Sequence, residues 1–325
     1  MIFSKEITDS FRFRYFKKLV LTFFYSLVIL ISVGTFSSFA QNNLNDITMI
    51  KSAKNGLCLT STNLNFVTTY NCSKSINQNF LPTLGQIVSG KQCLNYQNNK
   101  FVLSKCTDQP SEIFLLTGER FLNPVTNQCL SINKSSLAFS SCSLDVSNTF
   151  NVLYFNNNKS VSYMPFNCIN YISTSEKLSC NVLKEWNNWN MPYSNHYNLL
   201  SSYTDGNAYE EWCADFVSYI YQQSGVPFIN GERNGWDEYN ANNVQNENLT
   251  YHSADSNYTP KSGDVAFFNY PGGHVEMVAI GGKTPTFIYG DSATIDSQTG
   301  NGDMAANTKK SVGSLGNVMY YLSIN

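Results

Sequence analysis

One cysteine, Cys213, stands in a pattern that suits nucleophilic chemistry. In residues 211–220, Trp212, Phe216 and Ile220 recur at every fourth position, which predicts an amphipathic helix with Cys213 in its first turn. A thiol at the start of a helix meets the positive end of the helix dipole, which favours the thiolate, the nucleophilic form. The expected chemistry is therefore covalent catalysis by a cysteine.

A cysteine nucleophile needs a general base, and the chain contains three histidines, His196, His252 and His274. His274 follows the turn-forming residues Pro-Gly-Gly at 271–273 and opens an apolar run that ends at Ile280. This pattern predicts that His274 lies at the start of a strand.

Two further short strands are expected beside the His274 strand. Residues 261–269 read as a turn followed by a strand, and residues 286–289 read as a strand that ends at Gly290-Asp291-Ser292. An antiparallel meander packed on the Cys213 helix would align a thiol, an imidazole and a carboxylate. A cysteine-histidine pair with an orienting third group requires this alignment.

Three ordered blocks in this region resemble the family of cysteine, histidine-dependent amidohydrolases and peptidases, called CHAP. They are Trp-Cys-Ala-Asp-Phe-Val-Ser at 212–218, Gly-Asp-Val-Ala-Phe-Phe at 263–268 and Gly-His-Val at 273–275. The resemblance covers residues 195–325. It implies a papain-like α+β domain that, in most members of the family, cleaves amide bonds in bacterial peptidoglycan.

The third member of the catalytic set departs from the family pattern. CHAP domains commonly carry Glu-Gly-Asn where this chain has Tyr289-Gly290-Asp291. Asp291 stands at the asparagine position and is the first candidate to orient His274. Glu276 is the alternative, because it lies two residues along the strand and shares the face of His274.

The N-terminal residues predict export. Four basic residues between positions 12 and 18 precede a largely apolar run at 19–33, and Ser38-Phe39-Ala40 places small residues before Gln41. Residues 1–40 are therefore interpreted as a signal peptide of a secreted or periplasmic protein, with no stable membrane insertion after cleavage. An uncleaved membrane anchor is the alternative.

Nine cysteines in an exported chain predict disulfides with one thiol left over. Neighbouring cysteines fall into pairs 12 to 14 residues apart, and this pairing leaves Cys213 single. The expected pairs are Cys58–Cys72, Cys93–Cys106, Cys129–Cys142 and Cys168–Cys180.

Three of these pairs lie in an internal repeat. Each unit opens with Cys-Leu and places a phenylalanine eight residues after its second cysteine, at Phe80, Phe114 and Phe150. A unit this short cannot bury its own core, so the units are expected to share one. Three strand-rich units around a pseudo-threefold axis would achieve this.

Residues 46–155 resemble the ricin B-type lectin β-trefoil, whose lobes carry a Cys-Leu start, a second cysteine and a Gln-x-Trp ending. Phenylalanine replaces the tryptophan here. The resemblance implies a carbohydrate site in the first lobe, with Tyr70 at the stacking position and Asn77 and Gln78 at the amide positions. Thr60 stands where an aspartate is usual.

The second and third lobes look like poorer sugar sites. Asn95 takes the aspartate position in the second lobe, and both lobes have serine at the aromatic position. The alternative for the whole module is a trefoil kept as a structural or protein-binding domain. Residues 156–194, which hold the Cys168–Cys180 pair, are interpreted as a disulfide-bonded connector or a partial fourth repeat.

The remaining segments of the C-terminal domain are expected to be mostly loops. Residues 227–260 are polar and are interpreted as loops bordering the cleft, with Trp236 and Tyr239 lining it. Residues 292–314 also read as a loop, and 318–324 as a closing strand.

Charge and composition limit the partners. With 21 basic and 23 acidic residues, the formal charge of −2 favours no nucleic-acid partner. No cofactor and no metal are expected, because Cys213 and His274 suffice and no further His/Cys cluster stands near them. A monomer is expected.

The sequence thus predicts two domains, an all-β trefoil followed by an α+β papain-like CHAP domain. The predicted function is that of a secreted cysteine hydrolase, an N-acetylmuramoyl-L-alanine amidase or peptidoglycan endopeptidase targeted by a lectin-like module. The alternatives are a glycan-binding adhesin with an inactive papain-like domain, and a toxin or effector acting on a competitor's wall or on host glycoproteins.

Overall fold

The computed structural model describes residues 47–107, 109–143, 145–156, 159–161, 166, 168–204, 206, 211–226, 249–254, 256–270, 273–308 and 318–324. The described residues all belong to one structural unit, residues 47–325. The predicted signal peptide, Trp236 and Tyr239 lie outside the described residues.

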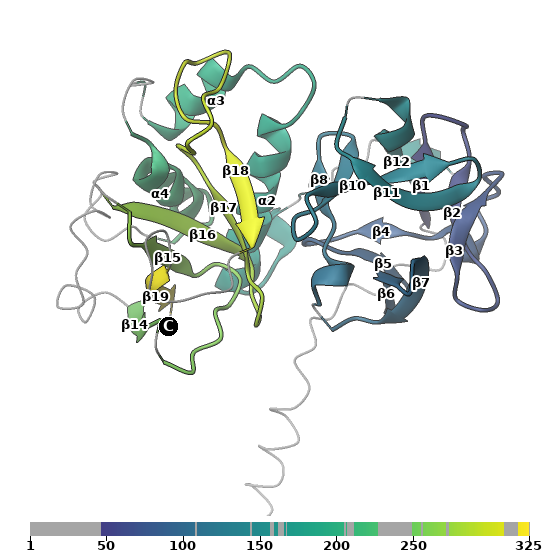
Figure 1. Cartoon of the computed structure of the whole chain (residues 1–325), viewed down its shortest axis with the longest axis horizontal. Helices are drawn as coiled ribbons and strands as arrows, with labels where there is room; N and C mark the ends of the chain where they lie inside the picture. Colours follow the sequence, from purple (N-terminus) through teal and green to yellow (C-terminus); the bar gives the residue numbers. More distant parts are fainter. Residues whose placement is uncertain are drawn as a thin grey trace, which may run out of the picture. The chain divides into compact units, whose positions relative to one another are not determined.

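The first part of the described chain consists of short strands and single turns of 3-10 helix (Figure 1). Its strands are β1 (Ile47–Ser52), β2 (Cys58–Ser61), β3 (Val67–Tyr70), β4 (Leu81–Pro82), β5 (Ile87–Ser89), β6 (Gln92–Gln97), β7 (Lys100–Lys105), β8 (Leu115–Thr117), β9 (Arg120–Asn123), β10 (Gln128–Asn133), β11 (Ser136–Ser141), β12 (Phe150–Asn156) and β13 (Lys159–Val161). The 3-10 turns are η1 (Ile76–Gln78), η2 (Pro110–Glu112) and η3 (Val146–Asn148).

These strands form three antiparallel sheets of similar design. Their orders are β13-β12-β1-β2-β3, β4-β5-β6-β7 and β11-β10-β9-β8. Each sheet includes one hairpin joined by a disulfide, and all four predicted disulfides are present, with Cys213 outside them. The pairing predicted from spacing alone is therefore confirmed.

The three repeated phenylalanines lie in one shared core. Phe80, Phe114 and Phe150 are each at most 2% exposed, and they pack in one cluster with apolar strand residues such as Leu94 and Leu130. The apolar residue closing each unit therefore serves the common core. This is the arrangement expected for units too short to fold alone.

The polar residue two positions before each phenylalanine is also buried. Gln78, Glu112 and Asn148 are at most 1% exposed. The Gln78 Oε1 atom accepts the Ser73 N–H at 2.7 Å, and the Glu112 Oε2 atom accepts the Thr107 N–H at 2.7 Å. These side chains fix the loop after the second cysteine, because their buried polar atoms need hydrogen-bond partners.

Within residues 156–194, expected as a connector or a partial fourth repeat, the structure has the 3-10 turn η4 (Cys168–Asn170) and then helix α2 (Thr174–Trp189). Ser173 and Glu176 form a capping box at its start, a signal that was readable in the sequence. The Trp186 Nε1–H donates to Thr117 Oγ1 at 3.0 Å, and the Ser179 hydroxyl donates to the Ala279 carbonyl at 2.6 Å. This segment is therefore a structural helix that contacts both β-rich parts.

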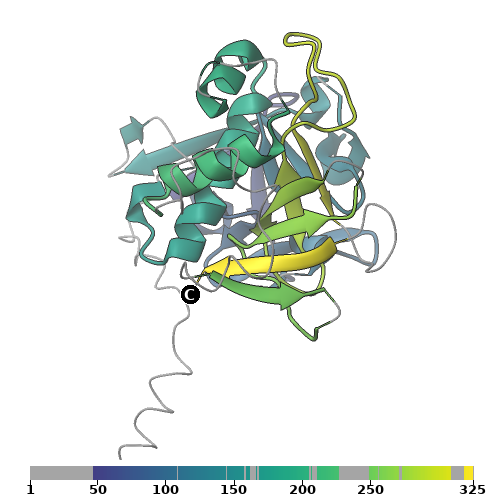
Figure 2. The same ribbon diagram turned by 90° about the vertical axis from the view of Figure 1, so that its left-hand side faces the viewer.

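The second part of the described chain is one antiparallel sheet with helices packed against it. The order β14-β19-β15-β16-β17-β18 contains the predicted meander, and the teal helices lie on one face of the green and yellow strands (Figure 2). The elements are α3 (His196–Tyr203), α4 (Cys213–Gln223), β14 (Leu249–Ser253), β15 (Val265–Phe268), β16 (His274–Ile280), β17 (Thr286–Tyr289), β18 (Ala305–Thr308) and β19 (Val318–Ile324).

Two of these strands lie where loops were expected. β14 and β18 are the edge strands of the sheet, and β14 pairs with β19 while β18 pairs with β17. Edge strands carry polar residues because one side of the strand faces solvent, so their composition resembles that of loops.

In the described residues, no helix is long and apolar enough to cross a membrane.

The shared core predicts a specific cost for truncating one of its phenylalanines. We expect Phe114→Ala to lower the free energy of unfolding by about 3–5 kcal/mol, because it removes a buried ring and leaves a cavity. Ile76→Ala is the control, since Ile76 is 72% exposed and its truncation is expected to change stability by less than about 0.5 kcal/mol. Urea titration of both variants tests this, and equal losses would contradict a shared core around Phe114.

Candidate functional site

Cys213 is the first residue of helix α4 and is 8% exposed. The helix starts where predicted, and its apolar stripe of Phe216, Val217 and Ile220 is fully buried. The N-cap residue Trp212 makes no side-chain capping hydrogen bond. The thiol is thus held at the positive end of a well-packed helix.

His274 is the first residue of strand β16, as predicted, and its side chain is 12% exposed. Its Nε2 atom lies 3.5 Å from the Oε1 atom of Glu276, whose side chain is fully buried. The two residues share a face of the strand because their positions differ by two. Of the two carboxylates considered from the sequence, Glu276 is therefore the one beside the imidazole.

The end of helix α4 is joined to strand β16 through Gly263. The Tyr221 hydroxyl, near the end of α4, donates to the Gly263 carbonyl at 3.3 Å, and the Gly263 N–H donates to the Val278 carbonyl at 2.7 Å. From Cys213 to Tyr221 the helix rises about 12 Å, and from His274 to Val278 the strand rises about 13 Å. Cys213 and His274 therefore lie at about the same distance from this joint, one along the helix and the other along the strand.

The turn after β17 gives a second, independent link between the two residues. The rings of His274 and Tyr289 meet edge to face, with their centroids 5.0 Å apart. The ring of Trp212 covers the adjacent Gly290 so closely that a Cβ atom there would lie 2.2 Å from it. The immediate neighbour of Cys213 and the ring of His274 thus contact consecutive residues, so the thiol and the imidazole lie at the same end of helix α4 and strand β16.

Asp291 lies at the end of this turn, with a φ of 59°. Its carboxyl group accepts hydrogen bonds from the backbone N–H groups of Trp212 and Gly302. Burial and the nearby Glu211 carboxylate raise its pKa, against the lowering effect of these hydrogen bonds. Asp291 is therefore bound to the start of helix α4, whereas Glu276 lies next to His274.

The other two histidines occupy structural positions. The His196 ring stacks on Trp189 with centroids 4.2 Å apart, and its nitrogens lie 2.6 Å from Asp296 Oδ2 and 2.7 Å from the Trp189 carbonyl. The His252 ring stacks on Tyr258, and burial followed by the Lys261 charge lowers its pKa. His274 is thus the histidine placed with Cys213.

Asp264 anchors the turn that leads into strand β15. Its Oδ2 atom accepts hydrogen bonds from the Tyr258 hydroxyl at 2.6 Å and from the Lys261 N–H at 2.7 Å. Burial raises the pKa of this carboxyl to about 6, against the lowering effect of those hydrogen bonds. The turn before strand β15 therefore depends on a buried, titratable group.

The predicted sugar-binding residues separate into exposed and buried pairs. Tyr70 is 56% exposed and Asn77 is also exposed. Gln78 is 1% exposed and donates to the Thr60 hydroxyl at 2.9 Å, and Asn95 is 3% exposed and donates to the Glu112 carboxylate at 2.9 Å. Of these four residues, only Tyr70 and Asn77 expose their side chains to solvent.

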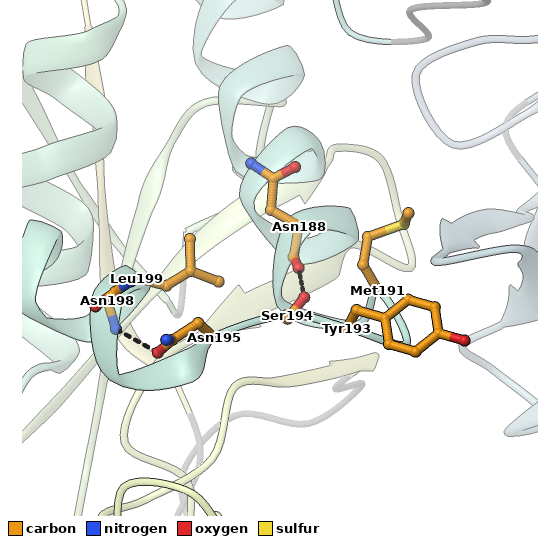
Figure 3. Close-up of a pocket in the computed structure, with 7 residues that line it drawn as sticks. All are labelled: Asn188, Met191, Tyr193, Ser194, Asn195, Asn198 and Leu199. Carbon is orange, nitrogen blue, oxygen red and sulfur yellow. Dashed lines mark hydrogen bonds between the residues drawn. The ribbon is translucent and has the colours of Figure 1, made fainter.

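A pocket of about 390 Å³ lies at the turn between helices α2 and α3 (Figure 3). Its lining residues are Asn188, Met191, Tyr193, Ser194, Asn195, Asn198 and Leu199. The Ser194 hydroxyl donates to the Asn188 carbonyl, and the Asn198 N–H donates to Asn195 Oδ1 at 3.0 Å, which shapes its wall. Neither Cys213 nor His274 lines this pocket, so it is separate from the cysteine-histidine site.

Among the described residues, no cluster of three or more His, Cys, Asp and Glu side chains could hold a metal ion. The chemistry available at the described site is that of the thiol, the imidazole and the adjacent carboxylate. These are the kinds of group that covalent catalysis by a cysteine requires as nucleophile, base and orienting group.

Comparison with protein-family models finds two matches in the chain. Residues 46–149 match the ricin-type beta-trefoil lectin domain, and residues 202–291 match the CHAP domain. Both families and their order agree with the resemblances in the sequence. The lectin match supports glycan binding, and the CHAP match supports amidase or peptidase activity.

Several solved structures are similar to the chain at low identity. The designed 3-fold symmetric protein ThreeFoil is 12% identical, with a TM-score of 0.30, over 32% of this chain and 96% of that one. The earthworm R-type lectin C-half in complex with GalNAc is 16% identical, with a TM-score of 0.30, over 32% and 95%. A PSL1a–E64 complex is 10% identical, with a TM-score of 0.30, over 82% and 98%. No curated protein matches the chain.

The raised pKa of Asp264 predicts a pH-dependent stability. Its pKa is about 6 in the folded chain against 3.8 for the ordinary carboxyl, so its contribution is fully present below pH 3.8 and is lost as pH rises through 6. Relative to Asp264→Asn, we expect the wild type to lose about 2–3 kcal/mol of unfolding free energy between pH 4 and pH 7.

Urea titrations of the two proteins at several pH values measure this difference. Parallel stability curves across that range would show that Asp264 has an ordinary pKa in the folded protein.

Proposed function

Because the chain joins a ricin-type β-trefoil lectin domain to a CHAP domain, we propose that it is a secreted cysteine hydrolase that cleaves amide bonds in bacterial peptidoglycan. The lectin domain would hold the enzyme on glycan. The bond cleaved is either the amide between N-acetylmuramic acid and L-alanine or a peptide bond in the stem. A papain-like core and a trefoil of three equivalent lobes are the folds we propose for the two domains.

The observation that carries this proposal is the placement of Cys213 and His274 at one end of α4 and β16, with Glu276 beside the imidazole at 3.5 Å. Acyl transfer by a cysteine requires a thiol, a base next to the thiol, and a carboxylate that orients the base. The His274 Nε2 atom faces Glu276, so the Nδ1 atom is the one assigned to the thiol. Glu276 then holds the tautomer and stabilises the imidazolium.

The first half of the reaction forms an acyl-enzyme. The Cys213 proton passes to His274, and the thiolate attacks the amide carbonyl carbon, forming a C–S bond and a negatively charged oxygen. The Cys213 backbone N–H, at the start of the helix, is one donor to that oxygen. The C–N bond then breaks as His274 returns the proton to the leaving amine.

The second half of the reaction releases the acid. His274 takes a proton from water, and the resulting hydroxide attacks the thioester carbonyl. The C–S bond breaks, the proton returns to the sulfur, and a free carboxylic acid leaves. No redox change occurs, so the cycle requires only water as co-substrate.

In the lectin domain, we propose that Tyr70 and Asn77 contact the glycan. Tyr70 offers an exposed aromatic face for a pyranose ring, and the exposed Asn77 amide can bond to hydroxyl groups. Gln78 and Asn95 are assigned a supporting role, because their hydrogen bonds lie inside the fold.

The missing glutamate at the end of β17 favours the adhesin alternative. Glu276 lies 3.5 Å from His274 and can take the place of that glutamate, which favours an active enzyme instead. Toxin or effector activity would use the same chemistry on another wall or on a glycoprotein.

The direct test is the release of new amino groups and reducing ends from purified peptidoglycan. We expect the wild type to release amines without reducing ends, Cys213→Ala to release none, and His274→Ala to be slower by about 10²–10⁴-fold. Glu276→Gln keeps the shape but removes the charge, so we expect about a 10- to 100-fold lower kcat. Reducing ends from the wild type, or full activity in Cys213→Ala, would contradict the proposal.

Glycan binding has its own test. We expect Tyr70→Ala to weaken binding to the best ligand from a glycan array by about 10-fold or more, because the stacking face is lost. Tyr193→Ala is a matched control, since Tyr193 is a 98% exposed tyrosine outside the trefoil. Titration calorimetry with Cys213→Ala as background measures both, and a loss only in Tyr193→Ala would move the site to the α2–α3 pocket.

A further inference from the structure

The turn after strand β17 and the loop that follows, residues 290–304, contact the start of the nucleophile helix. We propose that Asp291 is a positioning residue that holds Trp212, and through it Cys213, in place for attack. This inference rests on the proposed function, because the position of Cys213 matters to catalysis only if its thiol is the nucleophile.

The first support is the backbone of Trp212. The N–H groups of the first residues of a helix have no partner within the helix, and Trp212 makes no side-chain capping bond for α4. The Asp291 carboxyl accepts the Trp212 N–H and so supplies a partner from outside the helix. The residue immediately before the nucleophile is thereby fixed to the β17 turn.

The second support is Gly302, which binds the same two residues. Its N–H donates to the Asp291 carboxyl, and its carbonyl accepts the Trp212 indole N–H at 3.3 Å. A Cβ atom on Gly302 would lie 2.4 Å from Asp291 Oδ1, so the approach requires glycine. Trp212 is therefore held at its backbone by Asp291 and at its ring by Gly302.

The third support is the packing around the Trp212 ring. Trp189 stacks on it with centroids 5.3 Å apart, and the Trp189 indole N–H donates to Asp303 Oδ1 at 2.6 Å. Gly290 lies against the same ring and has no room for a side chain. The ring is enclosed by the loop residues that Asp291 joins to the helix, so a shift of Asp291 would move the helix start.

The electrostatic effect of Asp291 on the thiol separates this role from orientation of His274. A carboxylate at the helix start opposes a second negative charge on Cys213, so its removal favours the thiolate. A carboxylate that oriented His274 would instead stabilise the imidazolium, and its removal would lower the pKa of His274. The two roles therefore predict shifts in different groups.

The test compares Asp291→Asn with Asp145→Asn, a matched control. Asp145 also accepts a backbone N–H, from Ser147 at 3.0 Å, but in the trefoil. We expect Asp291→Asn to lower kcat on peptidoglycan by about 10- to 100-fold with KM changed less than about threefold, since misplacement of a nucleophile acts on the chemical step. Asp145→Asn should match the wild type.

A second readout needs no substrate. We expect the pH midpoint of Cys213 alkylation by iodoacetamide to fall by about half a pH unit in Asp291→Asn, and the pKa of His274, followed by NMR, to stay at its wild-type value. An unchanged midpoint and kcat would overturn the inference, and a lowered pKa of His274 would assign Asp291 to the imidazole instead. If the wild type fails to cleave peptidoglycan, the proposed function fails while the alkylation result still decides the role of Asp291.

Gly302→Ala provides a variant that keeps the carboxylate. Its added methyl group pushes against Asp291, so we expect kcat to fall by a similar factor without a downward shift of the alkylation midpoint. Wild-type kcat in Gly302→Ala would contradict a positioning role, including in the case where Asp291→Asn does not fold.

Discussion

The site depends on the close contact between the Trp212 ring and Gly290. Glycine at that point lets the indole lie directly on the backbone of the β17 turn, where a Cβ atom would lie 2.2 Å from the ring. Helix α4 therefore begins against the end of the strand that neighbours the histidine strand. Helix α4 and strand β16 also run in the same direction. The thiol at the start of the helix and the imidazole at the start of the strand therefore lie at the same end of the domain.

The two carboxylates near this contact lie against different groups. Glu276 is fully buried next to the imidazole, whereas Asp291 is bonded to backbone N–H groups at the helix start. A carboxylate beside an imidazole stabilises its charged form, while a carboxylate at N–H groups fixes a chain segment. The sequence offered Glu276 and Asp291 as alternatives for orienting His274. We assign that role to Glu276, and to Asp291 the role of fixing the helix start.

Much of the architecture was predictable because short-range chemistry determined it. The period of four residues located the helix at Cys213, the glycine turns located the strands of the meander, and the regular cysteine spacing identified the disulfides. Strand β18 was missed because edge strands resemble loops in composition. The link from Asp291 to Trp212 was not predictable, since it joins residues distant in sequence through a backbone N–H that leaves no pattern in residue types.

The central claim is that Cys213 and His274 act as a reactive pair. The most direct measurement is the rate of Cys213 alkylation from pH 4 to 10, in the wild type and in His274→Ala. The account predicts fast alkylation that persists well below pH 7 in the wild type, and a profile that rises only near the ordinary thiol pKa of about 8.5 in the variant. Identical profiles in the two proteins would show that the histidine does not act on the thiol, and would contradict the account.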